Sequence, residues 1–244
     1  MITATQRWVN DEFDAVHFGD KRLDKRFRSI LTDLGRHCGR TLASSFDAWA
    51  KIKASYRFFA NSRVTVSAML SPHIQHTIQR IRSHDTVLLA QDTTYFDFST
   101  RLKTEGLDLT NRSKLGKFTK GLMLHNTLAL TTDGMPLGLL DQRFIVRKQL
   151  FGKNATEKKQ IRHCNEAIDG KESRRWIDIV RQCHGMDFGT SRAVHVCDRE
   201  GDIYELFRDS HALGEHVLVR AARNRAIDKT KRRVSFRQPS KIMG

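Results

Sequence analysis

The chain has 244 residues, of which 39% are hydrophobic and 29% are charged, a balance typical of a folded protein rather than a disordered one. No apolar run approaches the roughly 18 residues that a membrane span needs, and the first residues carry no signal pattern, so we expect a cytoplasmic protein with no membrane partner. Lys and Arg number 43 against 27 Asp and Glu, and the net charge of +16 favours a polyanionic partner, above all nucleic acid.

The first part of the chain, 1–83, is predicted to form a basic, all-helical domain. Asp20 is expected to cap a helix in which Leu, Phe and Ile recur at helical spacing, while Lys and Arg fall mainly on the other faces. Those cations have two interpretations, a solvated helix face or a phosphate-binding surface. The high net charge favours the phosphate-binding surface.

Two further helices are predicted in this domain. One covers about 47–60, and its apolar stripe is expected to consist of Trp49, Ile52, Tyr56 and Phe59. Thr65 is expected to cap a short helix. Ser71 and Pro72 resemble a cap followed by a first-turn proline, which predicts that a separate helix begins there.

The second part, 84–226, is predicted to be an α/β layer. Strands are expected over the apolar run that begins at Thr86 and on both sides of the Asp133-Gly134 turn. A helix, a strand that stops at Asp198, another helix and a last strand follow. This late alternation predicts a partly parallel sheet, and 227–244 is predicted to be a short basic tail.

Two carboxylates are the candidates for chemistry. Asp198 ends one apolar run and Asp92 ends another, and sites in α/β sheets gather at the carboxyl ends of strands. If their strands were neighbours, the two side chains could share a divalent cation and support phosphoryl transfer. The competing interpretation, weighted equally, is that both residues only cap turns or helices.

Four stretches of the sequence resemble the DDE transposases, and within them the Tn-five-like branch of the insertion-sequence-four family. "QDTT" at 91–94 and "VCDREGDIYE" at 196–205 are similar to the first and second acidic motifs of that family. "FGDKRLDKRF" at 18–27 and "SYRFFANSRVT" at 55–65 are similar to its DNA-binding region. The resemblance extends to about Arg220.

The resemblance implies a DNA-binding domain over 1–83 and a ribonuclease-H-like core over 84–226, in which Asp92 and Asp198 hold Mg²⁺ or Mn²⁺. It implies cut-and-paste transposition, in which transposon ends in double-stranded DNA are nicked and joined to a target, and a nucleoid-associated location. For Tyr56, core packing is weighted above DNA contact. The candidate DNA contacts are Arg22, Lys25, Arg26, Tyr56, Arg57 and Arg220.

One departure from the family pattern concerns its third carboxylate. The family places a Glu in a Y-x-x-R-x-x-x-E-x-x-x-x-x-x-K pattern on a late helix, and this sequence contains no match to it. We therefore expect a carboxy-terminally truncated core that is impaired or inactive, and dimerisation on DNA only in a full-length form. The alternative is a non-catalytic DNA-binding fragment that competes with full-length transposase, so whether the chain is an enzyme stays open.

Overall fold

The computed structural model describes residues 3–101, 103–112, 118–146 and 173–222. The chain divides into two compact units, Met1–Ser83, called here the helical unit, and His84–Gly244, called here the sheet unit. The tail predicted at 227–244 lies outside the described residues. Among the described residues, none of the helices is long and apolar enough to cross a membrane.

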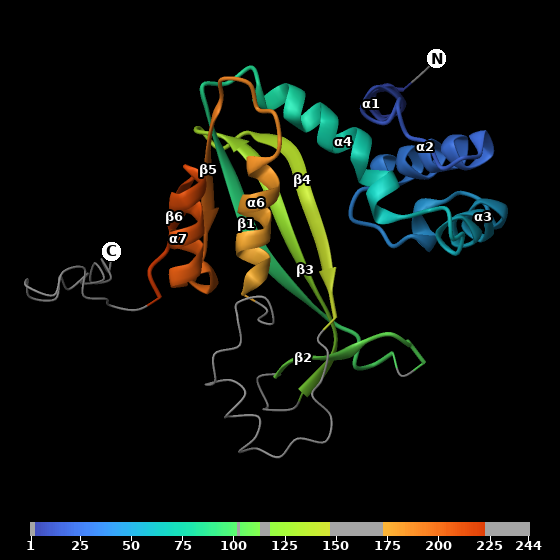
Figure 1. Ribbon diagram of the computed structural model, residues 1–244. Coiled ribbons are helices and arrows are strands. Elements are labelled where there is room, and N and C mark those ends of the chain that lie inside the picture. The colour runs from blue at the N-terminus through green and yellow to red at the C-terminus, as the bar shows by residue number, and fades with distance from the viewer. Residues whose placement is uncertain (1–2, 102, 113–117, 147–172, 223–244) are drawn as a thin grey trace, which may run out of the picture. The chain divides into compact units, whose positions relative to one another are not determined.

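The helical unit contains four α-helices and one 3₁₀ turn among its described residues (Figure 1). Their bounds are α1 Ala4–Glu12, α2 Lys21–Arg36, η1 Ala43–Ser45, α3 Trp49–Phe59 and α4 Val66–Ile81. Asp20 caps α2 as predicted, because its side chain accepts a hydrogen bond from the backbone N–H of Arg22. The helix α1 was not among the helices predicted individually.

The start predicted for the last helix was wrong. Thr65 does cap a helix, since its hydroxyl accepts from the N–H of Ala68, but that helix is α4 and it continues through Pro72 to Ile81. Pro72 therefore lies inside the helix rather than in its first turn. The proline is buried, and because it has no N–H, the helix lacks one backbone hydrogen bond at this position.

The apolar stripe predicted for α3 was right for Ile52, which packs against the core of the helical unit, and wrong for its other three residues. Trp49, Tyr56 and Phe59 are exposed, whereas Ser55 and Phe58 are the buried residues of this helix. The Phe58 ring joins an aromatic cluster, with its centroid 5.5 Å from that of Phe18. Edge-to-face rings at such distances attract one another beyond their burial, and this cluster sets which face of α3 turns inward.

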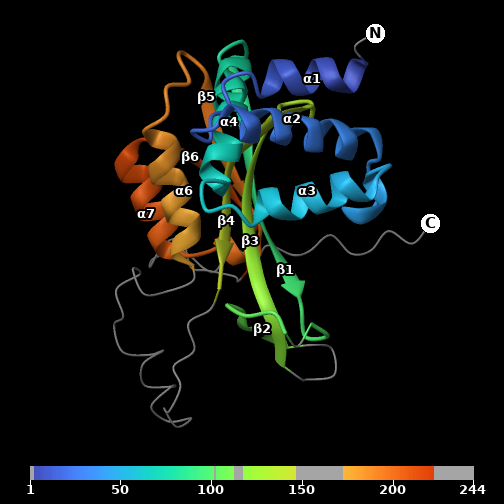
Figure 2. The same cartoon turned by 90° about the vertical axis from the view of Figure 1, so that its right-hand side faces the viewer.

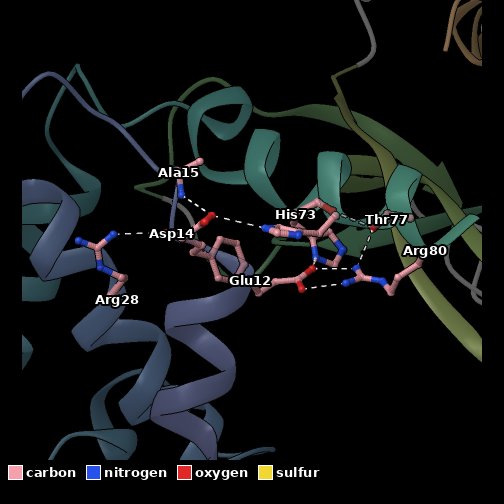
Figure 3. Close-up of polar contacts among 9 residues, drawn as sticks. Glu12, Asp14, Ala15, Arg28, His73, Thr77 and Arg80 are labelled. Atoms are coloured by element: carbon pink, nitrogen blue, oxygen red, sulfur yellow. Dashed lines mark hydrogen bonds and ion pairs between the residues drawn. The ribbon is translucent and has the colours of Figure 1, made fainter. Parts of the chain in front are cut away.

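A partly buried ionic cluster joins α1 to α4 (Figure 3). The Arg80 guanidinium donates to both carboxylate oxygens of Glu12, at 2.9 and 2.8 Å, and a ring nitrogen of His73 lies 2.6 Å from the same carboxylate. Burial alone would raise the pKa of Glu12, but the hydrogen bonds and charges of Arg80 and His73 outweigh it and hold that pKa below its usual range.

The described residues of the sheet unit form a mixed, six-stranded sheet. Its strands are β1 Thr86–Asp97, β2 Asp108–Arg112, β3 Phe118–Thr131, β4 Pro136–Ile145, β5 Arg192–Cys197 and β6 His216–Val219. They run in the order β2-β3-β1-β5-β6, and β4 also pairs with β3. The β1–β3 pair is antiparallel, while β1–β5 and β5–β6 are parallel.

Two helices, α6 Arg174–His184 and α7 Tyr204–Leu213, pack on one face of this sheet (Figures 1 and 2). The stripe predicted for α6 is confirmed, because Trp176, Ile179, Val180 and Cys183 are buried. Trp176 packs with Cys197 of β5 and Leu206 of α7. The prediction of an α/β layer with a partly parallel sheet, preceded by a helical region, is therefore confirmed.

Two details of the sheet differ from the sequence-based expectation. The strand β2 was not predicted, and β1 does not end near Asp92 but continues to Asp97. The residues beyond Asp92 include Thr93, Thr94, Tyr95 and Phe96, which are β-branched or aromatic and therefore suit a strand. The predicted hairpin is confirmed, and Gly134 in its turn has a φ of +91° that side chains disfavour.

Candidate nucleic-acid interface and candidate acidic site

A basic groove runs between α2 and α3 of the helical unit. Its volume is about 520 Å³, and its apolar floor includes Leu23 and Phe58. Ala50 and Ala54 are the small residues on the α3 side. The cations that line it are Arg22, Arg26, Lys53, Arg57 and Arg63, against one acid, Asp20.

The cations of this basic groove are mostly free to bind a ligand. Arg22 is paired with Asp20 at 3.0 Å, and the hydrogen bonds from Arg22 hold the pKa of Asp20 below its usual range. Within the described part of the chain, no carboxylate lies at ion-pair distance from Arg26, Lys53 or Arg57. Clustered, exposed and unpaired guanidinium groups are suited to phosphate oxygens, which they bind in bidentate geometry.

The candidate DNA contacts of this unit occupy different surfaces. Arg22, Arg26 and Arg57 line the basic groove, whereas Lys25 lines a separate hollow of about 410 Å³ with Arg28 and Arg36 among its neighbours. Tyr56 is 56% exposed, so the interpretation that it packs in the core is wrong, and it does not line the groove.

Lys53 and Arg63 were not selected from the sequence. Lys53 stands four residues before Arg57 on α3, and this helical spacing is the signal that would have placed both on one face. Arg63 lies in the turn after α3, and outside a helix or strand the sequence spacing does not predict which way a side chain points.

The candidate acidic site lies where β1 and β5 run side by side. Gln91 pairs in register with Cys197, so the next residues along the two parallel strands are Asp92 and Asp198. Asp198 keeps extended backbone angles, φ −76° and ψ −167°, although the strand has ended. Gln91 and Cys197 are buried on the face that α6 covers, and the alternation of side chains turns both Asp residues to the opposite face.

Two more polar residues extend this row across the sheet. Arg220 follows β6 directly, and its backbone N–H donates to the carbonyl of Cys197 at 3.0 Å, which brings it next to Asp198. On the other side, Asn126 of β3 pairs with Asp92, and its side-chain oxygen is buried with no hydrogen-bond partner in the described structure. Asn126 was missed in the sequence because it lies inside an apolar strand pattern.

A buried polar layer lies under the acidic site, between the sheet and α6. Gln91 lies 3.1 Å from a ring nitrogen of His195 and 3.4 Å from one of His125. Burial lowers the pKa of His125 to about 3, with Arg175 and Arg143 adding to the effect, and lowers that of His195 to about 4 against the opposing charge of Glu215. Both imidazoles are therefore neutral near pH 7.

The donor set of the acidic site suits a hard cation better than zinc. It offers the carboxylates of Asp92 and Asp198 and, on the opposite side of Asp92, the amide oxygen of Asn126. Mg²⁺ and Mn²⁺ prefer oxygen ligands of this kind. Over the described residues, no group of three or more His, Cys, Asp or Glu side chains is arranged to hold a metal ion.

Part of the helical unit resembles a known protein family. Residues 5–64 match the family model described as transposase DNA-binding. The matched segment covers α2, α3 and all of α1 except its first residue, and it contains every residue that lines the basic groove. This match supports a transposase-type, DNA-binding role for the helical unit.

Proposed function

We propose that this chain is a transposase-type protein that binds the double-stranded DNA of transposon ends through the basic groove. The observation that carries the proposal is that the groove's cations lie within the matched segment 5–64. Neutralising DNA phosphates with Arg and Lys releases counterions, which is the main source of affinity for such surfaces. The finer assignment, to the Tn-five-like branch of the insertion-sequence-four family, rests on the sequence resemblance.

The second part of the proposal concerns the sheet unit, which we assign to a ribonuclease-H-like core that acts on DNA phosphodiesters. Asp92 and Asp198 would hold Mg²⁺ or Mn²⁺, and Arg220 would bind a phosphate beside them. A bound cation of this kind stabilises charge on phosphoryl oxygens during transfer. The support is the strand register, in which Gln91 pairs with Cys197, so that Asp92 and Asp198 follow side by side although they lie far apart in the sequence.

DNA binding is tested with a triple variant, Arg26→Ala/Lys53→Ala/Arg57→Ala, and a fluorescent duplex titrated at several salt concentrations. We expect the slope of log affinity against log salt to fall by about 3, close to one per lost phosphate contact. The matched control is Lys21→Ala/Arg40→Ala, two exposed cations that do not line the basic groove. Equal losses in both variants would contradict the groove assignment.

The metal site is tested by nicking of supercoiled plasmid in Mg²⁺ or Mn²⁺. Asp92→Asn and Asp198→Asn should each lower nicking on the order of 100-fold or more, because each removes a charged ligand. Asp97→Asn is the control, since Asp97 lies on the same strand but accepts a hydrogen bond from the N–H of Ser99. Nicking that survives in both Asp variants would rule the site out.

A second candidate function is a non-catalytic DNA-binding protein that competes with a full-length transposase for transposon ends. The observation that favours it is that the described residues of the acidic site supply two carboxylates rather than three. The plasmid assay separates the two candidates. Tight, salt-sensitive binding with no metal-dependent nicking by the wild-type chain would support the competitor.

A further inference from the structure

Two of the contacts made by Arg175, in the first turn of α6, reach residues beside the candidate acidic site from the face of the sheet that α6 covers. The Arg175 Nε donates to the hydroxyl of Thr93 at 3.1 Å, and its guanidinium donates to the Glu200 carboxylate at 2.5 Å. The Arg175 side chain is only 7% exposed, while that of Glu200 is 44% exposed. A buried cation is retained only where its donors are satisfied, so these contacts fix the direction of the guanidinium.

The Arg175 acceptors Thr93 and Glu200 lie within two residues of the two candidate metal ligands in the sequence. Thr93 follows Asp92 directly on β1. Glu200 belongs to η3, the 3₁₀ turn Arg199–Gly201 that Asp198 caps, and the Asp198 carboxylate accepts from the Glu200 N–H at 2.8 Å. Arg175 thus links β1, which carries Asp92, to the turn η3, which Asp198 caps.

The turn itself is built to stay against the sheet. Gly201 is buried, and a Cβ at this position would meet the Cβ of Cys197 at 2.7 Å and the Trp176 ring at 3.5 Å. A larger residue would therefore push η3 outward. A contact from β1 also reaches this turn, because the Tyr95 hydroxyl lies 3.4 Å from the Glu200 carboxylate.

We propose that Arg175 is a positioning residue, which through Thr93 and Glu200 holds Asp92 and Asp198 at the separation that a shared divalent cation requires. This inference rests on the proposed metal site. Arg175 approaches from the face that α6 covers, whereas the two Asp side chains turn to the opposite face, so Arg175 does not contact the cation or DNA at that site. Groups that orient metal ligands in this indirect way typically contribute 10–100-fold to metal affinity.

A lysine cannot replace Arg175 in this role. The guanidinium has a planar fork of donors that reaches two acceptors at once, while an ammonium is a point charge on a flexible stem. Arg175→Lys should keep the charge and lose one of the two contacts. We therefore expect its metal affinity to lie between those of the wild-type chain and Arg175→Met.

The test measures Mn²⁺ affinity from the electron paramagnetic resonance signal of the free ion, in the full chain. Arg175→Met should weaken binding by about 10–100-fold. Glu200→Gln, which removes the charge of one acceptor, and Thr93→Val, which removes the other acceptor, leave Arg175 in place and should weaken binding in the same direction. Arg174→Met is the matched control, because Arg174 precedes Arg175 on α6 and pairs with Asp178 at 3.0 Å. Unchanged affinity in all three variants of the link would overturn the proposal.

A second measurement separates this inference from the metal site itself. Amide hydrogen exchange over 198–203 should become at least several-fold faster in Arg175→Met and Glu200→Gln, and stay unchanged in Arg174→Met. If the wild-type chain binds Mn²⁺ no better than Asp92→Asn, the metal site fails, and exchange alone decides whether Arg175 orders the turn. Exchange that is unchanged in every variant refutes the positioning role even where Mn²⁺ binds.

Discussion

Each of the two units contains an arginine–carboxylate pair with one buried partner, and the buried partner is the carboxylate in one unit and the arginine in the other. In the helical unit the carboxylate of Glu12 is 8% exposed and its partner Arg80 is 37% exposed. In the sheet unit Arg175 is the buried partner and Glu200 reaches the surface. A buried carboxylate gathers cationic side chains around itself and so joins helices. The buried guanidinium of Arg175 has several donors, and one of them binds Glu200 and so holds a surface turn in place.

The interiors around these pairs differ in the same sense. The core of the helical unit contains a cluster of phenylalanine rings, in which the ring centroids of Phe13 and Phe18 lie 5.3 and 5.5 Å from that of Phe27. The core of the sheet unit places two neutral histidines and a glutamine beneath the candidate acidic site. The candidate DNA-binding residues of the helical unit therefore lie on its surface, over an apolar core. The candidate acidic site of the sheet unit instead lies over buried polar side chains.

The largest expected effects come from removing one ring in each unit. Phe58→Ala and Trp176→Ala should each cost about 4 kcal/mol of unfolding free energy, because both side chains are fully buried in packed clusters. Phe58→Ala should abolish DNA binding, while Trp176→Ala should abolish metal-dependent activity. Hydrogen exchange resolved by segment would show which unit opens, and equal opening of both units in either variant would contradict the division between them.

A smaller effect is expected from Glu12→Gln. This substitution removes the charge that Arg80 and His73 share in Figure 3, and it should cost about 2 kcal/mol, since hydrogen bonds to charged groups contribute roughly this much. The control is Asp14→Asn. The Asp14 carboxylate is exposed and lies 3.4 Å from a ring nitrogen of His76, so this substitution should cost under about 0.5 kcal/mol of unfolding free energy. Chemical denaturation monitored by circular dichroism provides both values.

The pH dependence of stability should differ between the units. His125 and His195 have folded pKa values of about 3 and about 4, against 6.5 for an unfolded histidine. The unfolded chain therefore binds more protons as the pH falls below 6.5, and each histidine removes up to about 1.4 kcal/mol of stability per pH unit.

The carboxylate of Glu12 follows the same sign at lower pH. Its folded pKa lies below the ordinary value of 4.5, so its contribution is complete above that pH and is lost as the pH falls through the lowered pKa. Segment-resolved exchange at pH 5.5 should thus show a weakened sheet unit and an unchanged helical unit. The reverse order would contradict the assignment of neutral histidines.

Local sequence patterns predicted most of the elements and missed some of their faces. The Asp20 cap, the hairpin at Gly134 and the buried stripe of α6 follow from spacing and turn chemistry, and the structure confirms them. The stripe of α3 could not be predicted in this way. Ser55 is buried and Trp49 exposed because the phenylalanine cluster determines the inward face, and that cluster forms from residues distant in the sequence.

The neighbouring positions of the two candidate carboxylates could be predicted from the sequence, whereas the contacts that support them could not. Asp92 and Asp198 stand out because each follows an apolar run, and the register of β1 and β5 makes them neighbours. Arg175 could not be found from the sequence, since it appears as one more cation in a basic helix. Its contact with Thr93 joins residues separated by 82 positions, and only the packing of α6 on the sheet brings them together.

The burial of two thiols in the sheet unit has a practical consequence. Cys38 is exposed, whereas burial raises the pKa of Cys183 and of Cys197 to about 12, and the protonated thiol reacts poorly with alkylating reagents. With Cys164, which lies outside the described residues, replaced by Ser, a short maleimide pulse should modify Cys38 at once and spare the other two. Cys197 directly precedes Asp198 at the end of β5. Its labelling rate therefore measures how often β5 opens locally beside the two candidate carboxylates.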